Sequence, residues 1–387
     1  MLSLRKRDIY LDNAATTAVA PEVIKAMMPY FDAKYGNASS THSKGREVKE
    51  AMEKARKAIA KSIGASPEEI IFTSGGTEAN NFALKGIAFA NRSKGNHIIT
   101  SSIEHDCVLN SCKWLERQGF KVTYLDVDGE GFVNPETLEK AITPQTIIVS
   151  IIHGNNEIGT IQDLAALGAV CRKHNIYFHT DACQSYTKTI LDVKKQNLDL
   201  MTLNAHKIHG PKGVGALYIR KGVNIGTWQH GGGHERNLRS GTENIPGIVG
   251  FAEAVNQASS QKHIKHMTML RDEFIEGVEQ NIPEAKLNGP RGEKRLCNNI
   301  NFVFKRIEGE AIGGYLDLKN ISSSTGSACS SHSLEPSHVL QAIGLNKGDA
   351  NGSLRLSLSR YTTEEEIAIV LKELPPIIKK LRIMSPL

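Results

Sequence analysis

The sequence predicts an α/β fold in which a large domain is built on a mostly parallel, seven-stranded sheet and a smaller α+β domain lies beside it. Short runs rich in β-branched and other apolar residues recur along the chain, and amphipathic segments such as 104–118 and 161–174 lie between most of them. Alternation of strands with helices is typical of a largely parallel sheet that helices cover on both faces. The expected strands are 70–73, 97–100, 122–125, 146–152, 176–179, 198–203 and 215–219.

The expected division into domains follows from a change in this pattern. After about residue 255 the regular alternation is replaced by a long helical segment and then by shorter mixed elements. We therefore expect a large domain over residues 16–258. The smaller domain is expected to combine residues 1–15 with residues 259–387.

Composition narrows the possible classes of function. The chain has 387 residues, a formal net charge of +6 and 40% hydrophobic residues, which is ordinary for a soluble globular protein. It contains no block of Lys and Arg that would indicate nucleic acid, no apolar run of membrane-spanning length and no secretory signal. The six cysteines, at 107, 112, 171, 183, 297 and 329, include no CxxC pair. This spacing argues against a zinc site and favours reduced thiols in the cytoplasm.

Polar and glycine residues directly follow several expected strands, where ligands bind in sheets of this kind. Ser74-Gly75-Gly76-Thr77-Glu78 follows the first strand and leads into a helix. The backbone N–H groups of a helix N-terminus, glycines that permit close approach and the Thr77 hydroxyl suit a phosphate group. The alternative is an ordinary glycine turn with Thr77 as the helix cap. The motif is neither GxGxxG nor a Walker loop, so it does not indicate a dinucleotide or a nucleoside triphosphate.

The segment His179-Thr180-Asp181-Ala182-Cys183-Gln184 stands at the end of the fifth expected strand. The Asp181 carboxylate could hold a protonated ring nitrogen, and the Gln184 amide could hydrogen-bond a substituent of the same ring. One alternative is that Asp181 caps the next helix. Another is a metal pair of His179 with Asp181, which lacks a third ligand nearby.

Three further polar positions follow other strands. Lys207, between His206 and His209, precedes a glycine-rich turn, and a lysine amine held in a cleft can form a Schiff base. The alternative is a solvated loop lysine. His105 could stack on a flat cofactor or transfer a proton, although a lone histidine is more often structural. Asn156 follows the fourth strand and places an amide at the same sheet edge.

The segment SSTGSACSSHS, residues 323–333, contains one cysteine, Cys329, among ten small or polar residues. None of these side chains could pack a core, and the composition is typical of a surface loop. Cys329 is either an incidental surface thiol or a nucleophile that must move.

The ordered set of these motifs resembles that of the cysteine desulfurases of the NifS/IscS type, and the resemblance extends over essentially the whole chain. It implies pyridoxal 5′-phosphate as the cofactor, the aspartate-aminotransferase-like fold (fold type I) and a homodimer. The motifs are Asn-Asn-Glu-Ile-Gly (155–159), His-Thr-Asp-Ala-x-Gln (179–184), His-Lys-x-x-Gly-Pro-Lys-Gly (206–213), Arg-Ser-Gly-Thr (239–242) and Ser-Ala-Cys (327–329).

The resemblance also implies a role for each matching residue. Lys207 would bind the cofactor covalently, Asp181 would pair with its ring nitrogen, and His105 would stack on the ring. Arg355 would bind the substrate carboxylate, and Cys329 would be the nucleophile. The other implied contacts are Gly76, Thr77, Asn204 and His206 with the phosphate, Gln184 and Asn156 with the ring oxygen, Asn156 also with substrate, and Thr242 with the phosphate of the other subunit.

The implied activity is conversion of L-cysteine to L-alanine, with the sulfur carried as a persulfide on Cys329 to an acceptor such as an iron–sulfur scaffold. Lys207 would act as the base for the α-proton. A loop rich in Gly and Ser suits a thiol that collects sulfur inside the site and delivers it outside. One alternative is another enzyme of the same fold, a selenocysteine lyase or an aminotransferase. The other is a non-catalytic sulfur-carrier scaffold.

Overall fold

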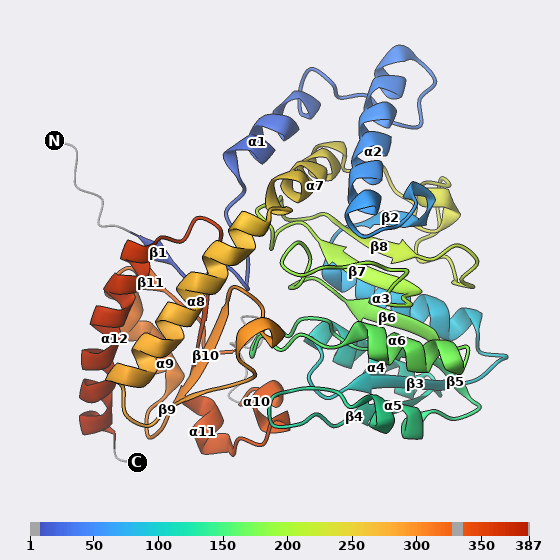
Figure 1. The fold of residues 1–387 in the computed structure, drawn as a ribbon. Helices are drawn as coiled ribbons and strands as arrows, with labels where there is room; N and C mark the ends of the chain where they lie inside the picture. The colour runs from blue at the N-terminus through green and yellow to red at the C-terminus, as the bar shows by residue number, and fades with distance from the viewer. Residues whose placement is uncertain (1–7, 327–335, 386–387) are drawn as a thin grey trace.

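The structure is a computed structural model that describes residues 8–326 and 336–385. Within these residues the largest sheet has seven strands in the order β2-β8-β7-β6-β5-β3-β4 (Figure 1). The strands are β2 (Ile70–Thr73), β3 (His97–Ser101), β4 (Lys121–Leu125), β5 (Thr146–Ser150), β6 (Tyr177–Asp181), β7 (Leu200–Asn204) and β8 (Gly215–Ile219). β8 runs antiparallel to β2 and β7, and every other neighbouring pair is parallel. The mostly parallel seven-stranded sheet predicted from the sequence is therefore confirmed.

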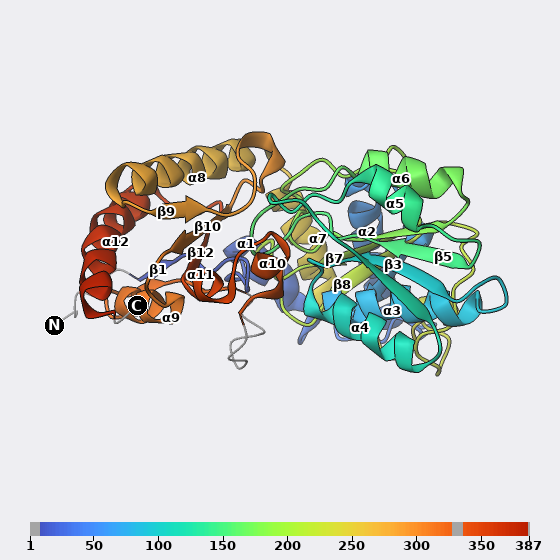
Figure 2. The same ribbon diagram turned by 90° about the horizontal axis from the view of Figure 1, so that it is seen from below.

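Helices cover both faces of this sheet. They are α1 (Pro21–Met27), α2 (Ser43–Ser62), α3 (Gly76–Ala90), α4 (Asp106–Arg117), α5 (Pro135–Ala141), α6 (Leu164–Lys173) and α7 (Ile245–Ala258), with short 3₁₀ turns η1 (Met28–Tyr30), η2 (Pro67–Glu69) and η3 (Glu235–Asn237). Ile98 packs in the core that contains α3 and α4, whereas its neighbour Ile99 packs in the core of α2 and α7. Side chains alternate across a strand in this way. Figure 2 shows α3 and α4 on one side of the sheet and α5 and α6 on the other.

The remaining elements form two smaller sheets and their helices, at the left of Figure 1. They are β1 (Ile9–Tyr10), α8 (Gln261–Asn281), β9 (Ala285–Leu287), η4 (Gly292–Lys294), β10 (Asn299–Phe304), α9 (Gly309–Asp317), β11 (Ile321–Ser322), α10 (His338–Ala342), α11 (Lys347–Asn351), β12 (Ser353–Ser357) and α12 (Glu364–Met384). One sheet is antiparallel in the order β12-β10-β9, and β1 pairs in parallel with β11. This pairing brings Ile9 and Leu11 into the same hydrophobic core as α8 and α12.

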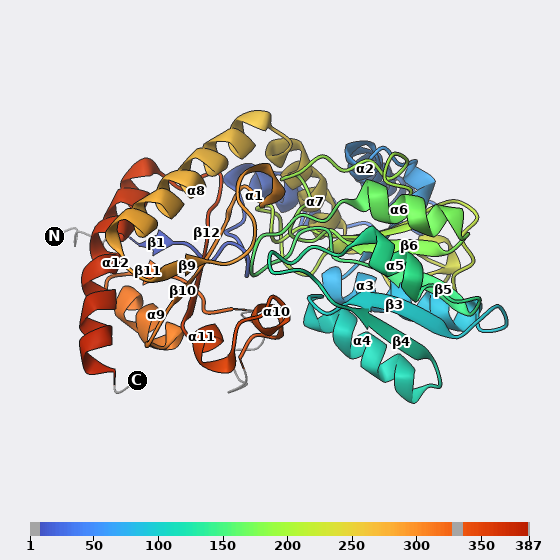
Figure 3. The same cartoon turned by 60° about the horizontal axis from the view of Figure 1, so that its bottom comes forward.

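α10 lies between the two parts of the chain (Figure 3). Its residues Val339 and Leu340 pack with Ile103, which follows β3, and with Ile152 and Ile158, which follow β5. This packing places the start of α10 beside the ends of the parallel strands. No helix in the described ranges combines the length and apolar character needed to cross a membrane.

β6 extends to Asp181, farther than the sequence predicted. The polar side chain of His179 is satisfied inside the sheet, because Nδ1 lies 2.8 Å from Oγ of Ser150 and Nε2 lies 3.0 Å from Oγ1 of Thr202. A polar residue whose hydrogen bonds are made by neighbouring strands can lie inside a sheet. In the sequence such a residue looks like the end of the strand. The consequence is that Asp181 is held by the strand itself.

Candidate active site

The carboxyl ends of β3, β5, β6 and β7 meet at one edge of the large sheet, where several candidate residues gather. Asp181 is the last residue of β6, and Asn204 is the last residue of β7. A Cβ added to Gly76, at the start of α3, would stand 2.6 Å from Sγ of Cys183 and 3.7 Å from Nδ2 of Asn204. Residues that are far apart in the chain therefore share one site.

Asp181 is buried, and both of its carboxylate oxygens are fixed. Oδ2 accepts a hydrogen bond from Nδ2 of Asn80 at 2.6 Å, and Oδ1 accepts one from the backbone N–H of Cys183 at 2.9 Å. Burial by itself raises the pKa of this carboxyl group, but His105 and these hydrogen bonds outweigh burial and hold the pKa below its usual value. The ionised carboxylate can pair with a cationic ring nitrogen. The residues after Asp181 form turns rather than a helix, so the helix-cap alternative is wrong.

Lys207 lies half-buried in the turn between β7 and β8. Its backbone carbonyl accepts a hydrogen bond from Nζ of Lys188 at 3.3 Å, and the same Nζ donates to the carbonyl of Gln184 at 2.8 Å. Burial is the main reason that the pKa of Lys188 falls to about 8, and the positive charge of Lys207 also lowers it. Lys188 therefore ties the turn that carries Lys207 to the turn that follows Asp181.

The N-terminus of α3 offers backbone N–H groups with no side-chain cap. Its N-cap residue is Gly75, so the alternative in which Thr77 caps the helix is wrong. The Asn204 Nδ2 atom lies 3.4 Å from Nε2 of His206, and its Oδ1 is buried with no hydrogen-bond partner among the described residues. Burial and nearby lysines lower the pKa of His206 to about 4. The helix N–H groups, the exposed Thr77 hydroxyl and the Asn204 amide together suit an anion.

His105 is the N-cap of α4, and its Nδ1 accepts a hydrogen bond from the backbone N–H of Cys107 at 3.1 Å. Burial is the main cause that lowers the pKa of His105, and the positive charge of Lys207 adds to it, whereas Asp181 acts in the opposite sense. The imidazole is therefore neutral near pH 7. Its proton lies on Nε2, because Nδ1 is already an acceptor.

Arg355, on β12, is the cation that the smaller part of the chain contributes. Its buried side chain donates from Nη1 to the carbonyl of Asn156 at 3.2 Å and from Nη2 to Oδ1 of Asp12 at 2.9 Å. The third nitrogen, Nε, is buried without a partner among the described residues. Gln184 contacts the N-terminal segment, because its Nε2 donates a hydrogen bond to the carbonyl of Ala14 at 2.8 Å.

Two candidate residues stand apart from this group. Thr242 is exposed in the loop before α7, and Cys329 lies outside the described residues. Ser337, the residue before α10, contacts a buried residue after β5, because its Oγ donates to Oε2 of Glu157 at 2.5 Å.

The other five cysteines are unpaired, and burial raises the pKa of each thiol. The pKa rises to about 12 for Cys107 and Cys171 and to about 11 for Cys297. A thiol with so high a pKa holds little thiolate at neutral pH and is a poor nucleophile.

Sequence reasoning missed Asn80, Cys107 and Lys188, which all contact candidate residues. Asn80 stands four positions after Gly76 on α3, and this spacing places both residues on one helix face. That periodicity is the signal that could have identified Asn80. Nothing local in the sequence distinguishes Lys188 from the other lysines.

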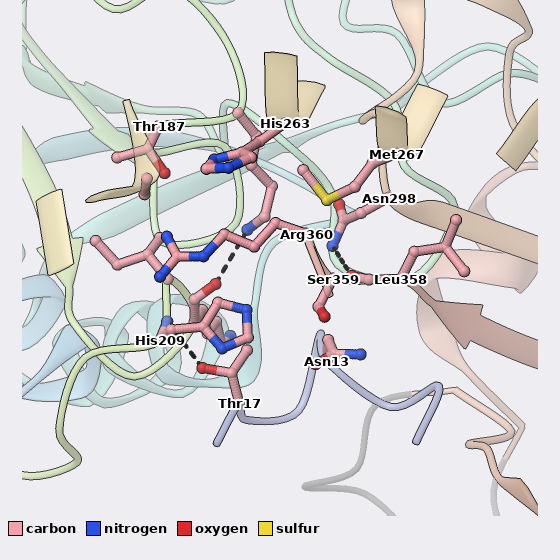
Figure 4. Close-up of a pocket in the computed structure, with 14 residues that line it drawn as sticks. Asn13, Thr17, Thr187, His209, His263, Met267, Asn298, Leu358, Ser359 and Arg360 are labelled. Atoms are coloured by element: carbon pink, nitrogen blue, oxygen red, sulfur yellow. Dashed lines mark hydrogen bonds between the residues drawn. The ribbon is translucent and has the colours of Figure 1, made fainter. Parts of the chain in front are cut away.

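A cavity lies behind the Lys207 turn, where the N-terminal segment, α8 and the residues after β12 meet (Figure 4). It encloses about 370 Å³ of empty space, including the part open to solvent. His209, His263 and Arg360 surround it in Figure 4, and Lys188 also lines it. Nη1 of Arg360 and Nδ1 of His263 are buried without a partner among the described residues. The Lys207 turn thus borders a cavity instead of a packed core.

Comparison with known proteins agrees with this geometry. Residues 9–370 match the class-V aminotransferase family. A protein named cysteine desulfurase IscS from Dictyoglomus turgidum is 53% identical over 383 residues, which cover 98% of this chain and 97% of the relative. A protein of the same name from Methanosarcina thermophila is 52% identical over 100% of this chain and 96% of the relative.

Solved structures give the same result. A NifS-like protein superposes with a TM-score of 0.91 at 41% identity, covering 97% of this chain and 100% of that chain. SspA in complex with cysteine superposes with a TM-score of 0.83 at 39% identity, covering 92% of this chain and 100% of that chain. Together with the sheet order, these likenesses confirm the predicted fold type I architecture. The chain belongs to the class-V aminotransferase family and, within it, to the cysteine desulfurases of the NifS/IscS type.

Proposed function

We propose that this protein is a cysteine desulfurase that depends on pyridoxal 5′-phosphate, converts L-cysteine to L-alanine and transfers the sulfur to Cys329 as a persulfide. The observation that carries the proposal is the buried, ionised Asp181, which shares one site with Lys207 and the N-terminus of α3. Two relatives that share about half of its residues are named for this activity. A structural neighbour binds cysteine.

The residues of the site fit the cofactor by charge and by hydrogen-bonding type. The N–H groups at Gly76 suit its phosphate, and Nδ2 of Asn204, a further donor, lies beside them. Asp181 suits the ring nitrogen, and Lys207 offers the amine for a covalent link. The remaining contacts that we propose are Thr77 and His206 with the phosphate, His105 with the ring face, and Asn156 and Gln184 with the ring oxygen. Once bound, pyridoxal phosphate supplies the electron sink that allows bonds near the substrate amino group to break.

The chain itself binds and orients the substrate. Nε of Arg355 is buried with no acceptor among the described residues, while Asp12 and the carbonyl of Asn156 hold its other two nitrogens. A substrate carboxylate is the natural partner for such a guanidinium group. Lys207 then removes the α-proton, and His105 keeps a proton on Nε2 that it can donate.

Sulfur transfer is assigned to Cys329. Its thiolate attacks the sulfur of the substrate, the substrate C–S bond breaks, and a new S–S bond forms the persulfide. The carbon skeleton takes up a proton and leaves as alanine, so atoms and electrons balance without an added oxidant. The high pKa values of the buried thiols support this assignment, because they leave Cys329 as the better source of thiolate.

We extend the proposal to assembly and location. The exposed Thr242 would reach the cofactor phosphate of a partner subunit in a homodimer. Two hydrophobic cores that each lie within one part of the chain support a large domain over 16–258 and a small domain of 1–15 with 259–387, and the core around α10 joins the two parts. Five unpaired thiols in the described part of the chain favour a reducing compartment, the cytoplasm. An iron–sulfur scaffold protein is the proposed sulfur acceptor.

The first test concerns the cofactor. The purified protein should be yellow, and borohydride should fix a pyridoxyl mass on the peptide that contains Lys207. A colourless protein that gains no absorption with added pyridoxal phosphate would overturn the proposal.

The second test concerns the reaction. Wild-type protein should form alanine from cysteine without an oxo acid, which an aminotransferase would require. Cys329→Ala should stop alanine formation but keep the yellow colour and the spectral response to cysteine, because these depend on Lys207 and Arg355. Full turnover by Cys329→Ala, or a persulfide found only on another cysteine, would refute the mechanism.

A further inference from the structure

Asn80 is completely buried on α3, and its amide group contacts two residues of the site. Nδ2 donates to Oδ2 of Asp181 at 2.6 Å and to Sγ of Cys107 at 3.1 Å, so both amide hydrogens are used. Oδ1 is buried without a partner among the described residues. The opposite orientation of the amide would put its oxygen against the Asp181 carboxylate, so charge determines which atom faces Asp181.

Cys107 continues this contact to His105. Its Sγ lies 3.0 Å from Nδ1 of His105, and its backbone N–H donates to the same nitrogen at 3.1 Å. Since Sγ accepts a hydrogen from Asn80, the thiol hydrogen is the one that points to Nδ1. Asp181, Asn80, Cys107 and His105 therefore form a directional network, here called the Asn80 network. The carboxylate of Asp181 and Nδ1 of His105 are the acceptors at its two ends.

A purely structural role does not account for Asn80. A buried amide oxygen without a partner destabilises the folded state, and a leucine of similar size would avoid that cost. Both hydrogen bonds of the Asn80 side chain go to residues of the site, and the backbone of α3 does not need them. The same helix begins at Gly76. One rigid element thus carries the phosphate-binding turn and the residue that fixes Asp181.

We propose that Asn80 is a positioning residue for the desulfurase reaction, holding Asp181 ionised toward the ring nitrogen of the cofactor. The inference rests on the proposed function and adds to it a residue that touches neither substrate nor cofactor. Oδ2 of Asp181 faces a donor that cannot accept a proton, and Oδ1 faces the backbone N–H of Cys183, which cannot accept one either. The other titratable groups near the Asn80 network are Lys207, Cys183, Asp106, His338 and Glu104.

The test compares Asn80→Leu with Asn81→Leu in the full-length holoenzyme. Asn81 is the matched control, because it neighbours Asn80 on α3 but donates only to the carbonyl of Thr77 at 2.9 Å. The readout is the ¹⁵N resonance of bound pyridoxal phosphate labelled at its ring nitrogen, followed as pH is raised. In Asn80→Leu the ring nitrogen should lose its proton about one pH unit or more below wild type, because Asp181 is no longer fixed. In Asn81→Leu it should titrate as in wild type.

Two further measurements separate positioning from folding. The kcat of Asn80→Leu for alanine formation should fall about tenfold with little change in KM, because Arg355 still binds the substrate. Its melting temperature should stay close to that of wild type, since removal of the orphaned Oδ1 offsets the loss of the hydrogen bond to Asp181. If Asn80→Leu does not fold, Asn80→Ala takes its place.

An Asn80 variant whose ring nitrogen titrates as in wild type would overturn this inference alone, provided that the wild type is active. Failure of both Asn80 variants to fold would assign Asn80 a structural role and also overturn it. A wild-type protein that binds no pyridoxal phosphate would instead overturn the proposed function, and the inference with it.

Discussion

Arg355 donates from Nη2 to Oδ1 of Asp12 at 2.9 Å, across 343 positions of the chain. The guanidinium side chain is 2% exposed and the carboxylate 18% exposed. This contact joins β12 to the N-terminal segment that follows β1. It also means that the residue proposed to bind substrate already has an anionic partner, which balances its charge before a substrate carboxylate arrives.

Asp12→Asn should therefore make the stability of the folded protein depend more strongly on a bound ligand. The variant leaves the Arg355 charge without its partner, and the expected loss of stability is roughly 3 kcal/mol, the low end for breaking a buried pair. A carboxylate ligand replaces the missing charge. Saturating L-alanine should thus raise the melting temperature of Asp12→Asn more than that of wild type.

The exposed Asp8 gives the control for this prediction. Asp8→Asn should melt like wild type and respond to L-alanine like wild type. An Asp12→Asn protein that gains no more from L-alanine than wild type would show that Arg355 does not receive the carboxylate.

Gly76 and Cys183 should be coupled in cofactor retention. A Cβ at Gly76 would stand 2.6 Å from Sγ of Cys183, which is too close for both atoms to remain in place. Gly76→Ala should weaken the binding of pyridoxal phosphate by about tenfold, the effect of a modest steric clash. Gly76→Ala combined with Cys183→Ala should recover most of that loss, because the sulfur is gone. Fluorescence titration of the apoprotein measures this, with Cys183→Ala alone as the control. A double variant as weak as Gly76→Ala would contradict the clash.

Glu104 makes a prediction about pH and stability. Its carboxyl group is buried, Oε1 accepts from Oγ of Ser101 and from the backbone N–H of Ile152, and Oε2 is buried with no partner among the described residues. Burial raises its pKa to about 8. The folded protein therefore keeps a proton on Glu104 that the unfolded chain loses above its ordinary pKa near 4.5. This contribution to stability is complete below pH 4.5 and is lost as pH rises toward 8.

Glu104→Gln should remove that pH dependence, because glutamine resembles the protonated acid and does not ionise. Its free energy of unfolding relative to wild type should increase between pH 5.5 and pH 7.5, by up to about 1.4 kcal/mol for each pH unit. Urea unfolding of the holoprotein at several pH values measures the difference. Glu50→Gln, on the exposed face of α2, should show no such trend. A Glu104→Gln curve parallel to wild type would mean that Glu104 is ionised in the folded protein.

The proposed homodimer predicts complementation between two impaired chains. If Thr242 completes the partner's phosphate site, a dimer of one Lys207→Ala chain and one Thr242→Ala chain has one intact site and one doubly damaged site. Such hybrids, purified through different tags, should recover roughly half of wild-type activity, as composite sites related by a twofold axis require. Hybrids no more active than either parent homodimer would rule out the shared site.

Much of the fold could be predicted because the signal is local. Alternation of buried apolar strands with amphipathic helices predicted all seven strands of the large sheet. The predicted positions of the strand ends were less accurate. β6 continues through His179 to Asp181, because Ser150 and Thr202 on the neighbouring strands hydrogen-bond both ring nitrogens of His179. The sequence of one strand does not show which residues its neighbouring strands place beside it.

The sequence by itself determined which chemical groups stand at the strand ends, because the period of a strand and the glycines of a turn are properties of adjacent residues. The tertiary structure alone decided how these groups are held. The contact of Asn80 with Asp181 spans 101 positions, and that of Arg355 with Asp12 spans 343. Hydrogen bonds and ion pairs of this kind depend on distance in space, which the order of strands in the sheet and the docking of β12 on the N-terminal segment determine. For that reason Asp181 could be identified from its motif, whereas Asn80 became visible only in the fold.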